Sequence, residues 1–261
     1  MIRIIEPKSP LVISVPHAGQ RIPEEIEARL TIAGRSRIDT DWHVDRLAEG
    51  LEDLGAGLIV AECSRYVIDL NRPPDDQPLY SGPTTGLVPT ETFSGAPLYL
   101  EGQVPGKAQI EARRAAYWRP YHEAIESQLA RAQARFGHAV LLDLHSILSH
   151  VPRLFEGELP ELNLGTNLGA SCAAPLREAL GRQLADSGFG HVVDGRFKGG
   201  YITRHYGQPS SGRHAIQLEI AQRCYLDESD PERWDPARAE PLRNWLASLV
   251  GFLMSWRPTR P

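Results

Sequence analysis

Cysteine is scarce in this 261-residue chain. The three cysteines, Cys63, Cys172 and Cys224, form an odd set without a CxxC pair. This pattern argues against a disulfide framework and against a zinc site built from thiolates. Free, buried thiols in a reducing compartment fit the pattern better, so we expect a cytoplasmic protein.

Long apolar runs and an excess of positive charge are also missing. No stretch approaches the roughly 20 apolar residues of a membrane-spanning helix, and residues 1–7 lack the basic segment and apolar core of a signal peptide. The formal net charge is -5, whereas phosphate binding favours clustered Lys and Arg. We therefore expect neither a membrane nor a nucleic acid as partner.

Three common sequence motifs of enzymes do not occur. The chain contains no G-x-S-x-G motif, which argues against a serine hydrolase of the α/β-hydrolase type. It contains neither G-x-G-x-x-G after a strand nor G-x-x-x-x-G-K-[ST], so nucleotide chemistry is disfavoured.

Two buried strands each end close to a histidine. The apolar run of residues 11–15 predicts the first strand, which Pro16 stops just before His17. The run of residues 138–145 predicts a second strand, apolar enough to be covered on both faces, with His145 at its carboxyl end. Ligands of open α/β sheets bind outside the carboxyl ends of strands, so these histidines mark a candidate site.

The remaining periodicity predicts alternating helices and strands in one α/β domain spanning residues 1–261. A long stretch at about 73–106 has no periodicity and is rich in Pro, Gly, Thr and Ser, and we interpret it as an ordered loop over a cleft. The other expected helices cover residues 23–30, 39 or 40 to 54, 107–136 with a kink or junction at Pro120, 173–187 and 231–256. The other expected strands cover residues 58–61, 65–70, 162–165, 191–193, 199–207 and 214–220.

His17 and His145 are candidate ligands of a catalytic zinc, which takes three protein ligands and leaves one position open. For the third ligand we favour Asp41, with Glu24 and His43 as alternatives. Taken singly, each histidine is better explained as an ordinary core or surface residue. The placement of both after buried strands favours the metal for this pair.

Two further groups could do chemistry beside such a metal. In residues 214–220 the apolar side chains share one strand face, which leaves Glu219 on the other face as a candidate general base. A solvated glutamate on an edge strand is the alternative. Arg65, Asn71 and Arg72 suggest capture of a carboxylate, unless the arginines are solvated or paired with a nearby aspartate.

Five motifs in order carry a family resemblance. They are Ser14–Gly19 (SVPHAG), Asp39–His43 (DTDWH), Asp69–Pro73 (DLNRP), Asp143–Ser146 (DLHS) and Gly199–Gly207 (GGYITRHYG). Together they resemble the N-formylglutamate amidohydrolase family over about residues 10–228. The resemblance implies hydrolysis of N-formyl-L-glutamate to formate and L-glutamate in histidine degradation.

The family is similar to the zinc carboxypeptidase and aspartoacylase group. This similarity implies a three-layer α/β/α fold of the phosphorylase/hydrolase type, with a mixed, largely parallel central sheet. It also implies that His17 and His145 bind zinc, that Asn71 and Arg72 bind a substrate carboxylate with Arg65 nearby, and that Glu219 is the catalytic base. The group's glutamate ligand falls at Gln20 here, a poor zinc ligand, so another carboxylate, for which we favour Asp41, must replace it.

The resulting hypothesis is a zinc-dependent amidohydrolase acting on a small acidic N-acyl amino acid. Arg65, Asn71 and Arg72 would hold the α-carboxylate and Arg204 the γ-carboxylate. Deacylation of another N-acyl acidic amino acid, such as acetyl- or succinyl-glutamate, is the alternative reaction, and a non-catalytic glutamate- or metal-binding protein is the alternative class. The sequence carries no prediction of the oligomeric state.

Overall fold

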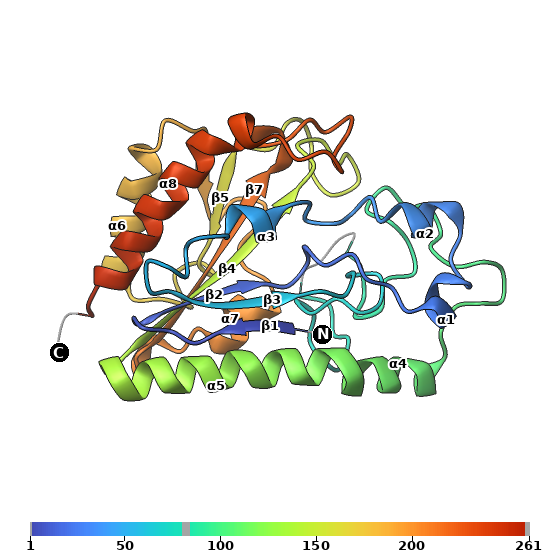
Figure 1. Ribbon diagram of the computed structural model, residues 1–261, viewed down its shortest axis with the longest axis horizontal. Coiled ribbons are helices and arrows are strands. Elements are labelled where there is room, and N and C mark those ends of the chain that lie inside the picture. Colours follow the sequence, from blue (N-terminus) through green and yellow to red (C-terminus); the bar gives the residue numbers. More distant parts are fainter. Residues whose placement is uncertain (1, 80–83, 259–261) are drawn as a thin grey trace.

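The computed structural model describes residues 2–79 and 84–258, and a mixed seven-stranded sheet forms its centre (Figure 1). The strand order is β1-β3-β2-β4-β7-β5-β6. Parallel pairs join β3, β2, β4 and β7 and also β5 with β6, whereas β1–β3 and β5–β7 are antiparallel. The strands are β1 (Ile2–Ile5), β2 (Leu11–Val15), β3 (Gly57–Ala61), β4 (Ala139–Ile147), β5 (Leu162–Gly165), β6 (His191–Val193) and β7 (Arg213–Ala221).

Helices cover both faces of the sheet, which confirms the predicted three-layer α/β/α architecture with a mixed, largely parallel sheet. One face is covered by α3 (Val44–Leu47), α6 (Ala174–Ala185) and α8 (Pro236–Ser255). The other is covered by α4 (Lys107–Arg113), the π-helical η1 (Arg114–Trp118), α5 (Arg119–Phe136) and α7 (Tyr201–Tyr206). The short elements α1 (Glu24–Glu27), α2 (Ile32–Ser36), η2 (Pro209–Ser211) and η3 (Gln222–Cys224) lie in the connections.

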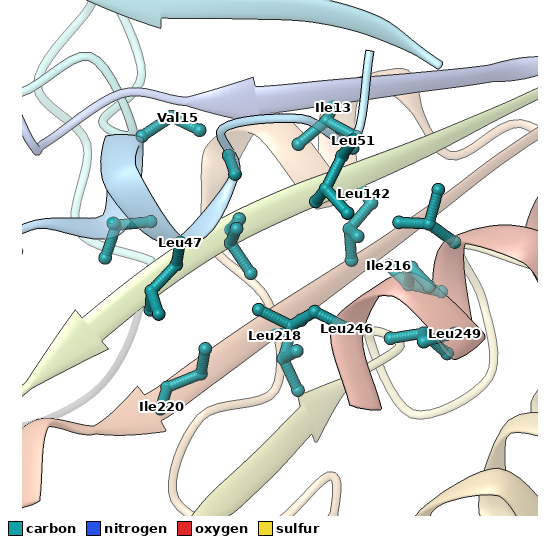
Figure 2. Close-up of a cluster of buried hydrophobic side chains, with 14 of the residues drawn as sticks. Ile13, Val15, Leu47, Leu51, Leu142, Ile216, Leu218, Ile220, Leu246 and Leu249 are labelled. Atoms are coloured by element: carbon teal, nitrogen blue, oxygen red, sulfur yellow. The ribbon is translucent and has the colours of Figure 1, made fainter. Parts of the chain in front are cut away.

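Side-chain alternation along β7 works as predicted. Ile216, Leu218 and Ile220 are fully buried in the core that also holds Leu246 and Leu249 of α8 (Figure 2). Burial of such side chains stabilises the fold by roughly 1.5–3 kcal/mol each. Because successive side chains of a strand alternate, Gln217 and Glu219 point to the opposite face of β7.

The helix expected from residue 39 or 40 to 54 is much shorter. Only α3 is helical, and the residue directly before it is His43, with φ of 59°, and not Asp39 or Thr40. The Asp39 carboxylate accepts hydrogen bonds from the Tyr66 hydroxyl and the Phe93 amide instead. Residues 39–43 thus form a connection that carries side chains to the edge of the sheet.

The expected strand at residues 65–70 is wrong. This segment forms turns, with the Val67 amide bonded to the Ser64 carbonyl and the Asp69 amide bonded to Leu87. Its apolar residues are buried as a strand's would be, but Arg65 and Asp69 pair with each other across one turn at 2.9 Å. The β-like composition therefore reflects burial and not sheet pairing.

The expected strand at residues 199–207 is also wrong, because Tyr201–Tyr206 forms helix α7. The Asn71 side-chain oxygen accepts a hydrogen bond from the Ile202 amide in its first turn. A partner 131 residues away therefore satisfies a helix-end donor that has no partner within the helix.

The other elements follow the expected pattern with shifted ends. The long helical region begins at Lys107. The π-helical η1 ends at Trp118, and Pro120 lies in the first turn of α5, which follows it. The C-terminal helix begins at Pro236 and not at 231, because Asp235 caps it. No helix or strand element occurs among the described residues of the 73–106 loop, and none of the described helices is long and apolar enough to cross a bilayer. The single domain stays a prediction.

Candidate functional site

Two neighbouring parallel strands bring His17 and His145 together. His17 follows β2 by two residues, His145 lies near the end of β4, and their ring centroids are 5.0 Å apart. Asp41 lies beside both, with its Oδ2 3.0 Å from Nδ1 of His145 and 3.8 Å from Nδ1 of His17. All three side chains are buried, and their ligand atoms lie within 4.8 Å of one another. This group could hold a metal ion.

Two carboxylates orient the imidazoles of this group. Nε2 of His17 lies 2.8 Å from Asp69 Oδ1, and Nε2 of His145 lies 2.9 Å from Asp143 Oδ2. Nδ1 of His17 is buried and has no hydrogen-bond partner. A buried imidazole nitrogen left over after the other nitrogen has donated to a carboxylate is the arrangement of a metal-ligating histidine. The two nitrogens and one carboxylate oxygen also match the donor set of a catalytic zinc.

The charges of the group suit a cation. Burial and the positive charge of Arg65 lower the pKa of His17, so its ring is neutral at pH 7. Burial opposes ionisation of Asp41 and Asp69, but their hydrogen bonds and the nearby cationic groups hold both pKa values below the usual range. Burial opposes protonation of His145, but the carboxylates of Asp143 and Asp41 raise its pKa well above the usual range, so this ring carries a proton that a bound cation would replace. A neutral imidazole beside ionised carboxylates is the state in which these groups bind metals.

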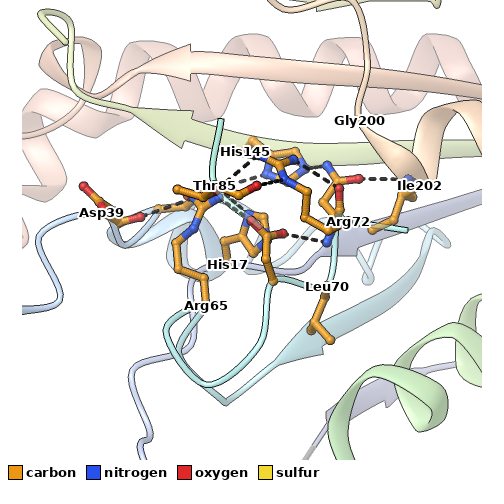
Figure 3. A network of polar contacts seen from close by, with 12 residues as sticks. His17, Asp39, Arg65, Leu70, Arg72, Thr85, His145, Gly200 and Ile202 are labelled. Atoms are coloured by element: carbon orange, nitrogen blue, oxygen red, sulfur yellow. Dashed lines mark hydrogen bonds and ion pairs between the residues drawn. The ribbon is translucent and has the colours of Figure 1, made fainter. Parts of the chain in front are cut away.

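Arg65 lies against this group and is already occupied. Its side chain lies beside His17 in Figure 3. The guanidinium pairs with Asp41 at 3.2 Å and with Asp69 at 2.9 Å, and it stacks over the Phe93 ring at 4.6 Å. Arg65 therefore balances the negative charge of the aspartates that hold the imidazoles. It also lines the cavity described below.

Asn71 connects the histidine on β4 to helix α7. Its amide nitrogen lies 3.0 Å from Nε2 of His145 and donates to Asp143 Oδ2, while its oxygen accepts from the Ile202 amide. A Cβ on Gly200 would come within 2.5 Å of the Asn71 amide. The glycine thus allows the helix to approach the site closely.

Glu219 lies next to His145 because β4 and β7 pair in parallel with these two residues in register. Gln217 donates a hydrogen bond from Nε2 to Oε2 of Glu219 over 3.1 Å. Burial raises the pKa of Glu219 to about 8. A carboxyl whose pKa lies near neutrality is suited to accept and return a proton.

A small cavity opens beside these groups, with a volume of about 70 Å³, room for several water molecules. Arg72 lines it and is anchored by a hydrogen bond from Nε to the Thr85 carbonyl of 2.8 Å. The cavity is lined by His17, Arg65, Asn71, Arg72, Thr84, Thr85, Phe93, His145, Ser146, Ile147, Leu154, Arg196, Phe197, Gly200, Gln217 and Glu219. Arg204 does not belong to this lining, and its Nε donates to the Gly199 carbonyl.

The alternatives for the third ligand lie elsewhere. Nε2 of His43 contacts the Pro231 and Glu232 carbonyls, which turns the ring toward the C-terminal segment. Glu24 is exposed, as is Gln20, and neither Glu24 nor His43 belongs to the buried group that could hold a metal. Asp41 is the carboxylate that the fold brings to the two histidines.

Comparisons with known proteins identify the family. The sequence matches the family model described as N-formylglutamate amidohydrolase over residues 9–226. The chain belongs to the N-formylglutamate amidohydrolase family. The resemblance carried by the five motifs is thereby confirmed, and the family spans most of the chain.

Two relatives and one solved structure align with almost the whole chain. N-formylglutamate deformylase of Pseudomonas aeruginosa is 50% identical over 248 residues, 95% of this chain and 93% of the relative. N-formylglutamate deformylase of Pseudomonas putida is 47% identical over 252 residues, 96% and 94% of the two chains. The crystal structure of N-formylglutamate amidohydrolase from Ralstonia eutropha JMP134 superimposes with a TM-score of 0.82 at 27% identity, covering 97% of each chain.

Four residues of the site were not identified from the sequence. Asp69 and Asp143 support the histidines, Gln217 contacts Glu219, and Arg196 lines the cavity. Gln217 carried a signal, because it shares the polar face of β7 with Glu219. Asp69 and Asp143 open two of the five motifs, which places them near the site but does not show which imidazole each contacts.

Proposed function

We propose that the protein hydrolyses N-formyl-L-glutamate to formate and L-glutamate, using a divalent metal ion for which zinc fits best. The names of its relatives support the substrate. The observation that carries the chemistry is the buried group of His17, Asp41 and His145 beside Glu219 at one cavity. These are the parts that metal-assisted hydrolysis of an amide needs.

Nδ1 of His17, Oδ2 of Asp41 and Nδ1 of His145 would hold the ion. When bound there, zinc polarises a carbonyl and lowers the pKa of a water molecule. Asp69 and Asp143 keep the second nitrogen of each imidazole engaged, so that both Nδ1 atoms face the same point. Three protein ligands leave a position open for water or substrate.

Glu219 moves the proton. Its carboxylate accepts a proton from the attacking water, whose oxygen forms the new bond to the formyl carbon. When the carbon–nitrogen bond breaks, the same carboxyl returns the proton to the departing nitrogen of glutamate. Burial keeps the carboxyl away from competing water and raises its pKa to about 8, which favours return of the proton.

Arg72 provides the binding site for the α-carboxylate. It lines the cavity, and hydrogen bonds to Thr84 and Thr85 hold its guanidinium in place. A guanidinium held in this way places a fixed positive charge beside the cavity, which attracts a carboxylate. Arg65 adds positive charge from the side of Asp41 and Asp69. Contact of Asn71 with the substrate stays a prediction, since both ends of its amide have partners in the protein.

The decisive experiment combines metal analysis with formate release. Purified protein should contain about one equivalent of zinc, release formate from N-formylglutamate, lose this activity after chelation and regain it with zinc. N-acetyl- and N-succinylglutamate test the alternative acyl groups, and faster release of acetate or succinate would reassign the substrate. Full activity in protein shown to be metal-free would refute the proposed metal dependence. Absence of all turnover in zinc-loaded protein would refute the proposal that the protein is an enzyme.

The cellular compartment is part of the proposal. Cys63, Cys172 and Cys224 are all free thiols, and free thiols persist in reducing compartments such as the cytoplasm.

A further inference from the structure

The proposed substrate has two carboxylates, and the following inference rests on that proposed function. Three arginines line the cavity, Arg65, Arg72 and Arg196. Arg65 is engaged by ion pairs with Asp41 at 3.2 Å and with Asp69 at 2.9 Å. Arg72, beside the turn that supports His17, serves one substrate carboxylate. Arg196 is the third arginine of this lining.

The position of Arg196 is built into the fold. Its Nε donates to the Leu154 carbonyl over 2.6 Å, and its guanidinium lies 5.5 Å from the centre of the Phe197 ring. Leu154 and Phe197 also line the cavity. A guanidinium bound through Nε and covered by an aromatic ring keeps one orientation, which lowers the entropy lost when it binds a carboxylate.

The segment that carries Arg196 is anchored two residues earlier. Asp194 adopts a left-handed backbone conformation with φ of 53°. Its carboxylate accepts hydrogen bonds from the Thr166 amide and hydroxyl and pairs with Arg177 at 2.9 Å. These bonds join the end of β6 to the end of β5, so Arg196 extends from a fixed point and not from a loose loop.

We propose that Arg196 binds the side-chain carboxylate of the substrate and makes that second negative charge a requirement for efficient turnover. This assignment replaces Arg204, which the sequence suggested for the same carboxylate. Arg204 lies in α7, outside the lining of the cavity, and its Nε contacts the carbonyl of Gly199. Arg196 and Arg204 are eight positions apart, and substitution of only the one that binds the side-chain carboxylate should reduce turnover of a substrate that carries it.

The test pairs two substrates with three variants. N-formylglutamate and N-formylglutamine have nearly the same shape, but only the first carries the second charge. We would measure kcat/KM for both substrates with the zinc-loaded parent protein, Arg196→Met, Arg196→Lys and Arg204→Met. Melting temperatures and zinc content of each variant show that fold and metal are retained.

We expect the parent to prefer N-formylglutamate, and Arg196→Met to lose about 30-fold or more on it while changing little on N-formylglutamine. Arg196→Lys should recover part of the preference, since it keeps the charge and loses the planar fork. If Arg196→Met fails to fold, a preference undiminished in Arg196→Lys overturns the inference. Equal effects of Arg196→Met on both substrates, or a selective loss in Arg204→Met alone, overturn it as well. A parent inactive on N-formylglutamate would instead refute the proposed function.

Discussion

Gln217 donates a hydrogen bond from Nε2 to Oε2 of Glu219, two residues further along β7. The orientation of the amide follows from its other end, where Oε1 accepts the Gly200 amide hydrogen over 2.7 Å. A backbone N–H can only donate, so Nε2 must face the carboxylate. Glu219 is thereby tied to the beginning of α7, and Gln217 is a positioning residue for the proposed base.

Gln217→Met removes this donor with little change in side-chain length. We expect kcat to fall by about 10-fold, the value of one hydrogen bond to a charged group, with KM changed less than about 3-fold. Steady-state kinetics on N-formylglutamate would measure both. A rise in KM with unchanged kcat would instead place Gln217 in substrate binding.

Glu219→Gln keeps the size of the side chain but cannot take up a proton. We expect kcat to fall by about 10²–10⁴-fold, the usual contribution of general acid–base catalysis, with KM and zinc content retained. Kinetics, calorimetric binding of N-formylglutamate and elemental analysis would check the three quantities. Retained turnover would leave Glu219 without its proposed role, and binding in a parent without turnover would indicate a non-catalytic protein.

The same substitution should stabilise the metal-free protein at alkaline pH. Burial raises the pKa of Glu219 from 4.5 to about 8. The folded protein therefore holds a proton that the unfolded chain releases in this range. Below pH 4.5 the Glu219 carboxyl is protonated in both states, and its burial costs no stability through ionisation. As the pH rises, ionisation favours the unfolded chain, so the free energy of unfolding falls until the pH exceeds about 8. The melting temperature of Glu219→Gln minus that of the parent should grow from pH 6 to pH 9, and a constant difference would contradict the shift.

Asp69→Asn tests the support of His17. The amide cannot hold the imidazole tautomer as a carboxylate does, so we expect zinc affinity to fall by about 10–100-fold. Competition with a chelator of known affinity would measure this. Asp235→Asn is the matched control, because Asp235 caps α8 away from the lining of the cavity. Equal zinc affinities of Asp69→Asn and Asp235→Asn would show that Asp69 does not support the metal site.

Gly200→Ala tests the close approach of α7 to the site. The new Cβ would lie 2.5 Å from the Asn71 amide, which hydrogen bonds hold in place. We expect lower activity and a lower melting temperature. Gly181→Ala, in α6 with nothing within 4 Å of the new Cβ, should instead stabilise the protein by about 0.5–1 kcal/mol. Thermal unfolding and formate release of both variants would show whether the effect of Gly200→Ala is local to the site.

Patterns within a few residues were enough to predict part of the site. The run of residues 11–15 ending at Pro16, the buried strand before His145 and the alternation around Glu219 all describe local backbone and burial. Parallel pairing of β2, β4 and β7 then aligns their ends. The meeting of His17 with His145 followed from these features, because strands of one sheet share an edge.

The two wrong strand predictions, at residues 65–70 and 199–207, share one cause. Residues 65–70 have the composition of a strand, yet their backbone turns so that Arg65 and Asp69 reach the histidine group. Residues 199–207 contain two leading glycines and β-branched residues, yet α7 forms where Asn71 and Gln217 satisfy the amides at its start. In both segments, partners distant in sequence outweigh the local propensity.

The sequence by itself determined the family, the alternation of strands and helices, and the delivery of two histidines and a glutamate to one end of the sheet, since all of these depend on residue order and local burial. Only the tertiary structure decided that Asp41 and not Glu24 or His43 joins the histidines, that Asp69 and Asp143 orient them, and that Arg196 and not Arg204 lines the cavity. These choices depend on hydrogen bonds and packing between segments far apart in the chain, which no local pattern encodes.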